Sequence, residues 1–415
     1  MIATGTHVSM YVWMEILCEI RVSFIFAPGI TVKCVSVLFQ VRLYLNWVRY
    51  AIDIVMNGRT FVVINMDETS INSVEDNGCG LTRRKASRQQ AQRRVPDGDD
   101  RSNVKTTLLA TVCDSAALQP LLPQVILPKY TKRASPPQTL RSSYAATGEP
   151  LEYWHRTSGW ATTLLIKMWA TRMRSVIHSF NPEAWIILVW DCSQTHLNVE
   201  VAAHLRLLGI LVIMLPAKLT WLLQVCDVCV FREFKQRLRM HKTFLRLASS
   251  DGRLSAGDWI SCCGGALREI IVNRSWEDAF DRMGLGADVA SIAGRVRRAA
   301  DVDAIRPALP TRVEFGRMVN KAHHTDVFKR LHSSIVGHFL HVQSLPLGTL
   351  PRRGAVVHSP DVAPAENKRR HDVGDGRSWE DVMQSHLSSS TMQARLRAHG
   401  RLPALNRDTV VAAAD

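Results

Sequence analysis

The sequence has few cysteines for its length, and they do not form a disulfide framework. Nine occur in 415 residues, and only Cys226 and Cys229 stand as a Cys-x-x-Cys pair. This usage is typical of a reducing compartment and excludes the class of small, disulfide-stapled secreted domains. A structural zinc site would need a second pair at matching spacing. A thiol or zinc protein built on Cys226 and Cys229 is therefore the least favoured of the functions weighed below.

Long uninterrupted apolar runs are also lacking. Residues 22–41 approach the length of a membrane span but contain Pro28, Gly29, Lys33 and Gln40, which favours a buried core element. The first residues do not show the basic, apolar and small-residue segments of a secretion signal. We therefore expect no membrane partner.

Acidic residues are scarce relative to basic ones. Lys and Arg number 52 against 37 Asp and Glu, which gives a formal net charge of +15. Such an excess favours polyanionic partners, nucleic acid first and an anionic membrane surface second. A basic protein without a polyanionic partner is the alternative.

The apolar pattern predicts a mixed α/β sheet flanked by helices. Short β-branched runs predict strands that end at Asp67, at Asp191 and before Pro216, and residues 105–127 predict a hairpin disturbed by prolines. Apolar residues at helical spacing predict helices over residues 158–180, 199–208 and 222–247. The order of these elements is that of a mixed sheet.

The chain divides into four expected parts. Residues 1–57 form an unassigned amino-terminal extension without a visible helix-turn-helix, and residues 58–290 form the α/β domain. Residues 291–344 predict a helical extension. Residues 345–415 are rich in Pro, Gly, Ser and Arg, which predicts a largely disordered tail.

Three aspartates occupy positions where such a sheet would gather them. Asp67 and Asp191 each end a predicted strand, and Asp227 lies on the helix after the last strand. Carboxylates a few ångströms apart cannot all stay ionised unless cations neutralise them. Two magnesium ions about 4 Å apart on such a cluster can cleave or transfer a phosphodiester. Spacing alone is a weak signal, because aspartate is common at strand ends and helix caps.

The blocks that contain these acids resemble a known family. "NMDETSI" (65–71), "VWDCSQTH" (189–196) and "LPAKLTWLLQVCDVCVFREFK" (215–235) are similar to the three signature blocks of the DDE superfamily endonuclease domain. This domain occurs in pogo-like transposases and in their domesticated relatives of the jerky and centromere protein B type. "SGWATTLLIKMW" (158–169) and "SWEDAFDRMGLG" (275–286) resemble two further family blocks, so the resemblance covers about residues 58–290.

The resemblance implies a ribonuclease H-like fold and a metal-dependent reaction on DNA. It assigns the catalytic and metal-binding roles to Asp67, Asp191 and Asp227, with Mg²⁺ or Mn²⁺ as the cofactor and two ions as the expected number. It also implies DNA as the partner and the nucleus as the location, and it leaves homo-oligomerisation open.

The resemblance further implies supporting roles for His196, Gln224 and Lys235, while the cysteines depart from the pattern. Cys192 stands where the family often has asparagine, and Cys226 and Cys229 stand where it usually has leucine and glycine. No departure removes an acid. His196 either orients Asp191 or contacts a phosphate, or it is a surface or capping residue, and the sequence leaves these interpretations open.

Other residues have competing interpretations. Adjacent strand residues point to opposite faces, so we expect a structural role for Glu68, and Glu233 is a rival to Asp227 that lies off the same helical face. Tryptophans that either stack on bases or pack in the core are Trp154, Trp160 and Trp169. The cations that either contact DNA, form a two-part nuclear import signal or cover a solvated loop are Arg83, Arg84, Lys85, Arg88, Arg93 and Arg94.

Two functions remain in competition. The first is a transposase-derived protein whose DDE-type domain cleaves or transfers DNA strands with a divalent metal. The second is a catalytically silent, domesticated DNA-binding or chromatin protein, which the missing amino-terminal DNA-reading domain favours.

Overall fold

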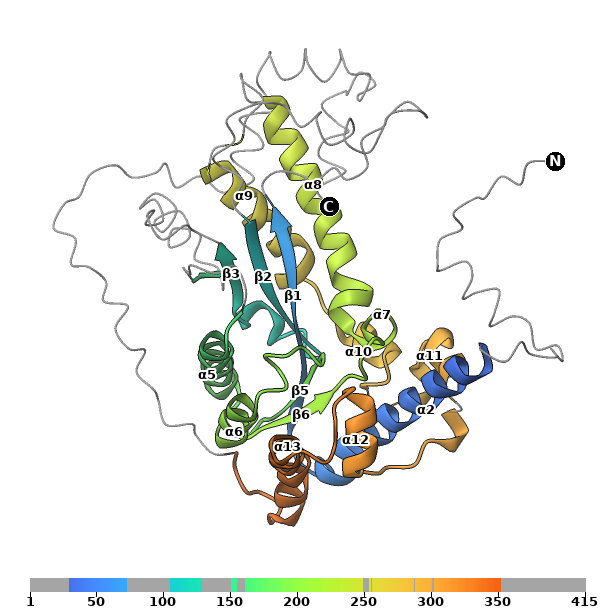
Figure 1. The fold of residues 1–415 in the computed structure, drawn as a ribbon. Coiled ribbons are helices and arrows are strands. Elements are labelled where there is room, and N and C mark those ends of the chain that lie inside the picture. Colours follow the sequence, from blue (N-terminus) through green and yellow to red (C-terminus); the bar gives the residue numbers. More distant parts are fainter. Residues whose placement is uncertain are drawn as a thin grey trace, which may run out of the picture.

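A single six-stranded sheet forms the centre of the protein in this computed structural model (Figure 1). The structure describes residues 30–72, 105–128, 151–154, 161–248, 254, 256–286, 288–300 and 302–351. The strands are β1 (Phe61–Asn72), β2 (Lys105–Cys113), β3 (Gln124–Pro128), β4 (Leu151–Tyr153), β5 (Trp185–Trp190) and β6 (Ile210–Met214).

The strand order is β4-β3-β2-β1-β5-β6. β2 is antiparallel to both β1 and β3, whereas β5 and β6 run parallel to β1, and β4 runs parallel to β3. The expected mixed α/β, ribonuclease H-like fold is thus confirmed. All residues of β5 and β6 are buried, as expected for parallel strands covered on both faces.

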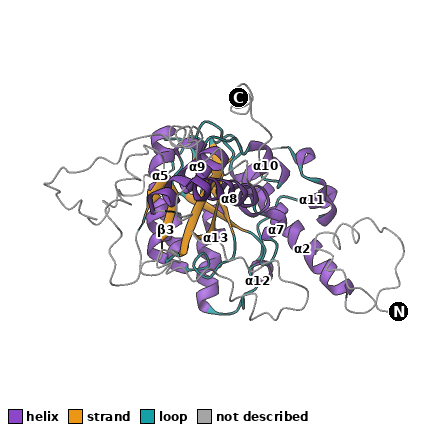
Figure 2. Cartoon of the chain, turned by 90° about the horizontal axis from the view of Figure 1, so that it is seen from above, coloured by secondary structure: helices purple, strands orange, loops and turns teal. Residues whose placement is uncertain are grey.

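Helices cover both faces of the sheet (Figure 2). The α-helices are α2 (Ile30–Arg49), α5 (Thr163–Phe180), α6 (Val199–Leu207), α7 (Thr220–Leu223), α8 (Phe231–Ala248), α9 (Ala256–Leu267), α10 (Glu277–Arg282), α11 (Gly294–Ala299), α12 (Arg312–Met318) and α13 (Asp326–Ser344). Shorter 3₁₀ or π turns are η1 (Tyr50–Val55), η2 (Gln119–Leu121), η3 (Cys226–Val230), η4 (Arg268–Val272), η5 (Val289–Ser291) and η6 (Val302–Ala304).

Polar caps begin several of these helices. The Thr162 hydroxyl accepts a hydrogen bond from the Leu165 amide at the start of α5, and Asn198 accepts from Glu200 at the start of α6. Such bonds satisfy amides that the first helical turn leaves without partners. The Asn198 cap therefore sets the start of α6 directly after the loop that follows β5.

The amino-terminal helix packs against the carboxy-terminal helices. Trp47 on α2 is fully buried and meets Phe315 of α12 and Phe339 of α13 edge-on, at ring-centroid distances of 5.8 and 5.7 Å. Figure 1 shows α2, α12 and α13 side by side below the sheet. Residues 37–55 and the expected helical extension therefore share one hydrophobic core.

The expected long helix over residues 222–247 is wrong in one respect. Gln224 has an extended backbone, with ψ of 119°, and ends α7. A π-helical turn, η3, follows and leads directly into α8. Asp227 therefore lies in a π-helical turn and not in a regular α-helix.

Some expected features lie outside the described residues. These are the basic run between Arg83 and Arg94, Trp160, and the tail from residue 352 onward. Among the helices that the structure describes, none has the length and apolarity needed to cross a membrane.

Candidate active site

Two of the three acids lie where the pairing of the parallel strands β1 and β5 stops. Asp191 follows directly on β5, but the expectation that a strand ends at Asp67 is wrong, because β1 continues to Asn72 while it pairs with β2. Asn65 on β1 pairs in register with Val189 on β5. Asp67 and Asp191 each follow two residues later, so both acids extend beyond the paired segment at the same edge. Because side chains alternate along a strand, Asp67 lies on the same face of β1 as Asn65. Ligands of open α/β sheets are commonly bound outside the carboxyl ends of parallel strands, and here that is the end of β5, beside Asp67 of β1.

Asn65 joins the three elements that carry the acids. Its side chain is fully buried. The Nδ2 group donates a 2.7 Å hydrogen bond to the Val189 carbonyl on β5, and Oδ1 accepts a 2.8 Å hydrogen bond from the Cys226 amide in η3. Each acid lies one or two residues from this clamp: Asp67 follows Asn65, Asp191 follows Val189, and Asp227 follows Cys226.

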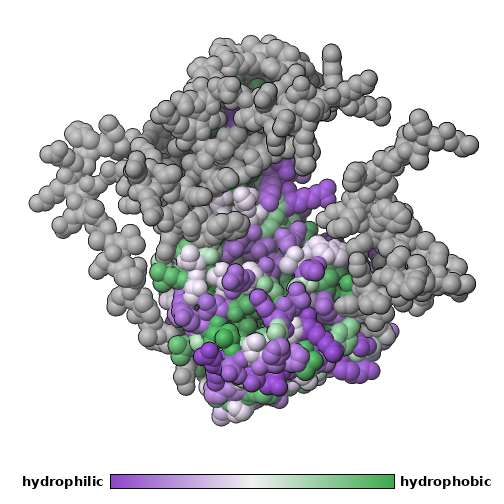
Figure 3. All heavy atoms as spheres, in the orientation of Figure 1, coloured by the Kyte–Doolittle hydropathy of each residue, from purple (hydrophilic) through white to green (hydrophobic). Residues whose placement is uncertain are grey.

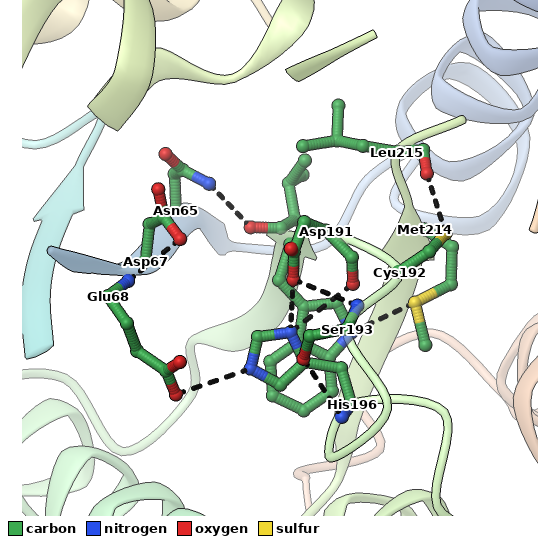
Figure 4. A network of polar contacts seen from close by, with 11 residues as sticks. Asn65, Asp67, Glu68, Asp191, Cys192, Ser193, His196, Met214 and Leu215 are labelled. Atoms are coloured by element: carbon green, nitrogen blue, oxygen red, sulfur yellow. Dashed lines mark hydrogen bonds and ion pairs between the residues drawn. The ribbon is translucent and has the colours of Figure 1, made fainter. Parts of the chain in front are cut away.

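The second acid is held by the imidazole of His196. His196 Nδ1 lies 2.5 Å from Asp191 Oδ1, and the Ser193 amide donates to the same oxygen at 3.2 Å. The imidazole is almost fully buried and stacks on Trp190, with ring centroids 4.2 Å apart and 5° between the planes. The structure thus places His196 beside Asp191, in the orientation expected of a residue that fixes a carboxylate (Figure 4).

Glu68 reaches the other nitrogen of the same imidazole. Glu68 Oε1 and His196 Nε2 are 4.0 Å apart, and neither buried atom has a hydrogen-bond partner among the described residues. One water can bridge two polar groups at such a separation. Glu68 therefore faces Asp191 through His196, while Asp67 lies on the opposite face of β1 (Figure 4).

The electrostatic setting of Asp67 and Asp191 is opposite. Burial, followed by the charges of Asp227 and Asp191, raises the pKa of Asp67 well above its usual range, although the Glu68 amide donates to its carboxylate. Burial also opposes ionisation of Asp191, but the hydrogen bond and charge of His196 outweigh it and lower the pKa of Asp191. Asp67 is the group that gains most from a nearby cation.

Lys235 lies between this acidic site and the rest of α8. It is half-buried, and its ammonium lies 5.8 Å from the centre of the Phe231 ring, one helical turn earlier. Burial lowers the pKa of Lys235, whereas the charges of Asp227 and Asp67 raise it and that of Arg239 lowers it. Asp227, which is exposed, thus shares its electrostatic environment with Asp67 and with this lysine.

Gln224 is buried without a hydrogen bond to either side-chain atom among the described residues. It lies between α7 and η3, three residues before Asp227. A buried amide without partners is costly. Its two polar atoms are available to a bound water or substrate group.

Burial raises the pKa of each cysteine near the acids. Burial, and then the charges of Asp67 and Asp227, raise the pKa of Cys226 well above its usual value, and burial raises that of Cys229. Cys192 directs its thiol at the Leu215 carbonyl, 2.8 Å away, and burial raises its pKa. Thiolates, not thiols, bind metals and attack disulfides. The raised pKa values therefore give no support to a redox or zinc role for the Cys-x-x-Cys pair.

A divalent metal fits the donor chemistry of the site. Within the described part of the chain, no three side chains of His, Cys, Asp or Glu converge closely enough to form a complete metal cage. Mg²⁺ usually keeps several waters and binds through one or two carboxylates and substrate phosphates. The raised pKa of Asp67, caused in part by Asp227 and Asp191, is the signature of a carboxylate group that a cation would stabilise.

The structure separates the remaining candidates from this site. Glu233 is exposed and pairs with Arg274. Trp169 is fully buried and donates to the Thr111 hydroxyl at 3.0 Å, so it packs in the core as expected, and Trp154 is half-buried. The residue that sequence reasoning missed is Asn65: it begins the block "NMDETSI", but a polar residue inside an apolar strand was its only signal.

Comparison with known proteins gives one match. Residues 105–265 match the family model described as DDE superfamily endonuclease. The match includes Asp191 and Asp227, whereas Asp67 precedes it. No curated protein and no solved structure matched the chain.

Proposed function

We propose, from the premise that this chain carries a DDE superfamily endonuclease domain, that it is a transposase-derived protein that cuts or transfers DNA strands. The observation that carries the proposal is the clamp of Asn65, which ties β1, β5 and η3 together beside Asp67, Asp191 and Asp227. A fold that fixes three carboxylate-bearing elements through one buried amide supports a role for these acids together.

Each side chain has a definite task in this proposal. Asp67, Asp191 and Asp227 would hold one or two Mg²⁺ or Mn²⁺ ions, which when bound activate water or a 3′-hydroxyl and stabilise the leaving oxygen. His196 keeps Asp191 ionised and oriented through their 2.5 Å contact. Lys235 offers its ammonium to a DNA phosphate on the Asp227 side of the site.

The test is nicking of supercoiled plasmid DNA by the purified full chain. We expect cleavage with Mg²⁺ or Mn²⁺ and loss of cleavage in Asp191→Asn, because the neutral amide weakens cation binding without changing side-chain shape. Asp278→Asn, an exposed acid on α10, is the matched control and should cleave as the wild type does. Equal cleavage by wild type and Asp191→Asn would refute the mechanism.

A catalytically silent DNA-binding protein is the second candidate. The observation in its favour is that the described residues do not form a complete three-ligand cage. It predicts DNA binding that is indifferent to divalent metal and to Asp191→Asn, together with no nicking in either metal. Nuclear action is part of both proposals, because DNA is the proposed partner in each.

A further inference from the structure

The long helix α8 leads away from the acidic site along the upper part of the molecule (Figure 1). It begins directly after η3, the turn that carries Asp227, and runs to Ala248. One face of α8 is buried through Phe231, Phe234 and Leu238. Its other faces carry a series of basic side chains that the proposed chemistry uses only at Lys235.

Three of these cations lie on one face. Arg232, Lys235 and Arg239 are three, four and seven residues apart, which places them on the same side of an α-helix. Arg232 and Arg239 are exposed and Lys235 is half-buried. We call these three residues the α8 basic stripe. Hydrophilic side chains lie over the lower part of α8, near its start, in the space-filling view (Figure 3).

The stripe differs from the neighbouring arginines in its pairing. Arg237, on another side of α8, lies 2.7 Å from Glu269, and Arg274 pairs with Glu233. Arg232 and Arg239 have no carboxylate partner among the described residues. Exposed cations that internal acids do not neutralise attract an external polyanion.

The stripe is also continuous with the acidic site. Lys235 interacts electrostatically with Asp227 and Asp67 on one side and with Arg239 on the other. The rise along the helix from Arg232 to Arg239 is about 10.5 Å, seven residues at 1.5 Å each. A strand whose phosphate lies at Lys235 can therefore place further phosphates near both arginines.

We propose that the α8 basic stripe binds the phosphate backbone of duplex DNA where it leaves the acidic site. The inference rests on the proposed function and assigns the surface of this chain that holds the flanking DNA. Arg232 and Arg239 make contacts with phosphate oxygens and carry no base specificity. The acids act on one phosphodiester, and the stripe sets the direction in which the duplex runs.

The test measures how DNA affinity depends on salt. A fluorescein-labelled 30-base-pair duplex of mixed sequence is titrated with the full chain at 50 to 200 mM salt, in Ca²⁺ or EDTA to prevent cleavage, and binding is followed by anisotropy. Each phosphate contact contributes about 0.9 to the slope of log K against log salt. The double variant Arg232→Ala/Arg239→Ala should therefore lower the slope by about 1.8, so that the wild type loses about 12-fold more affinity than the variant across this fourfold salt range.

The control is Arg237→Ala, which removes a cation from the same helix that Glu269 already neutralises. Its slope should equal that of the wild type. An unchanged slope in the double variant, an equal loss in Arg237→Ala, or no DNA binding by the wild type would overturn the inference. Stripe-dependent binding of an RNA duplex of the same sequence, without binding of the DNA, would also overturn it.

Failure of this inference and failure of the proposed function are distinguishable. If Asp191→Asn nicks plasmid as the wild type does while the double variant has the lower salt slope, the proposed cleavage mechanism is refuted and DNA binding by the α8 basic stripe is supported. If Asp191→Asn is inactive while the slope is unchanged, the mechanism stands and the stripe fails. Thermal unfolding of each variant confirms that the exposed substitutions leave the fold intact.

Discussion

Replacing Asn65 by leucine tests whether one buried amide holds the acid-bearing elements together. Leucine has a similar volume but neither donates nor accepts a hydrogen bond. The substitution leaves the Val189 carbonyl and the Cys226 amide without their present partner inside the core. Each buried group left unsatisfied costs about 1 to 3 kcal/mol, so we expect a loss of about 2 to 6 kcal/mol in the free energy of unfolding.

The measurement is urea unfolding followed by tryptophan fluorescence, with Mn²⁺ binding measured on the folded protein by electron paramagnetic resonance. Asn65→Leu should lower the unfolding free energy and weaken Mn²⁺ binding, because Asp67, Asp191 and Asp227 lose their common support. The two readouts separate a general loss of stability from a change at the acids.

Gln124 provides the matched control. It is a fully buried amide on β3 that accepts from the Thr111 amide at 2.9 Å and donates to the Thr111 carbonyl at 2.8 Å. Gln124→Leu should therefore also lose stability, mainly at the Thr111 amide because Gln119 still donates to the Thr111 carbonyl at 3.2 Å, with no effect on Mn²⁺ binding. The reasoning is refuted if Asn65→Leu costs less than about 1 kcal/mol, the lower bound for a single unsatisfied buried group, or if Gln124→Leu weakens Mn²⁺ binding to the same extent.

Two further predictions concern titratable groups outside the proposed chemistry. Burial raises the pKa of Asp114 to about 7, with smaller effects from Glu277 and Asp281 in the same direction. The folded state therefore binds a proton that the unfolded state releases near pH 4, so stability falls as pH rises from about 4 to about 7. Asp114→Asn should raise the free energy of unfolding at pH 8 by up to about 4 kcal/mol, and the melting temperature should rise with it. At pH 4 the substitution should leave both unchanged. An equal gain at both pH values would contradict this account. Because the Cys226 thiol is buried with a raised pKa, it should react with a thiol reagent at pH 8 only after unfolding, and equally fast reaction in native protein would show that the thiol is accessible.

The sheet could be predicted from the sequence because its central strands carry their own signal. "FVVINM" and "AWIILVW" are short β-branched and aromatic runs, and an aspartate follows each of them. Strands buried on both faces produce such continuous apolar runs. Proximity of Asp67 and Asp191 was expected only on the condition that their strands are neighbours, which β1 and β5 are. The continuation of β1 past Asp67 to Asn72 was not predicted.

The clamp and the turn around Asp227 could not be predicted in the same way. Asn65 can act as a clamp only because β5 and η3 both lie next to β1. The residues around Asn65 in the sequence do not predict that arrangement. The π-helical turn from Cys226 to Val230 contains apolar residues at spacings that also suit an α-helix. The contacts of Trp47 on α2 with Phe315 on α12 and Phe339 on α13 join segments far apart in the sequence, and periodicity carries no information about such contacts.

The arrangement of the acids explains why this site needs a rigid support. Burial and the charges of Asp227 and Asp191 all oppose ionisation of Asp67, so when Asp67 is ionised and no cation is bound, repulsion would move these side chains apart. Two contacts oppose that movement. The neutral amide of Asn65 holds β1, β5 and η3 together, and the imidazole of His196 holds the Asp191 carboxylate. A cation that binds the folded state and not the unfolded chain would relieve the same repulsion and stabilise the fold by mass action. The support is therefore most needed in the metal-free protein, which is the state in which the three elements must already be held in place for a cation and a phosphate to bind.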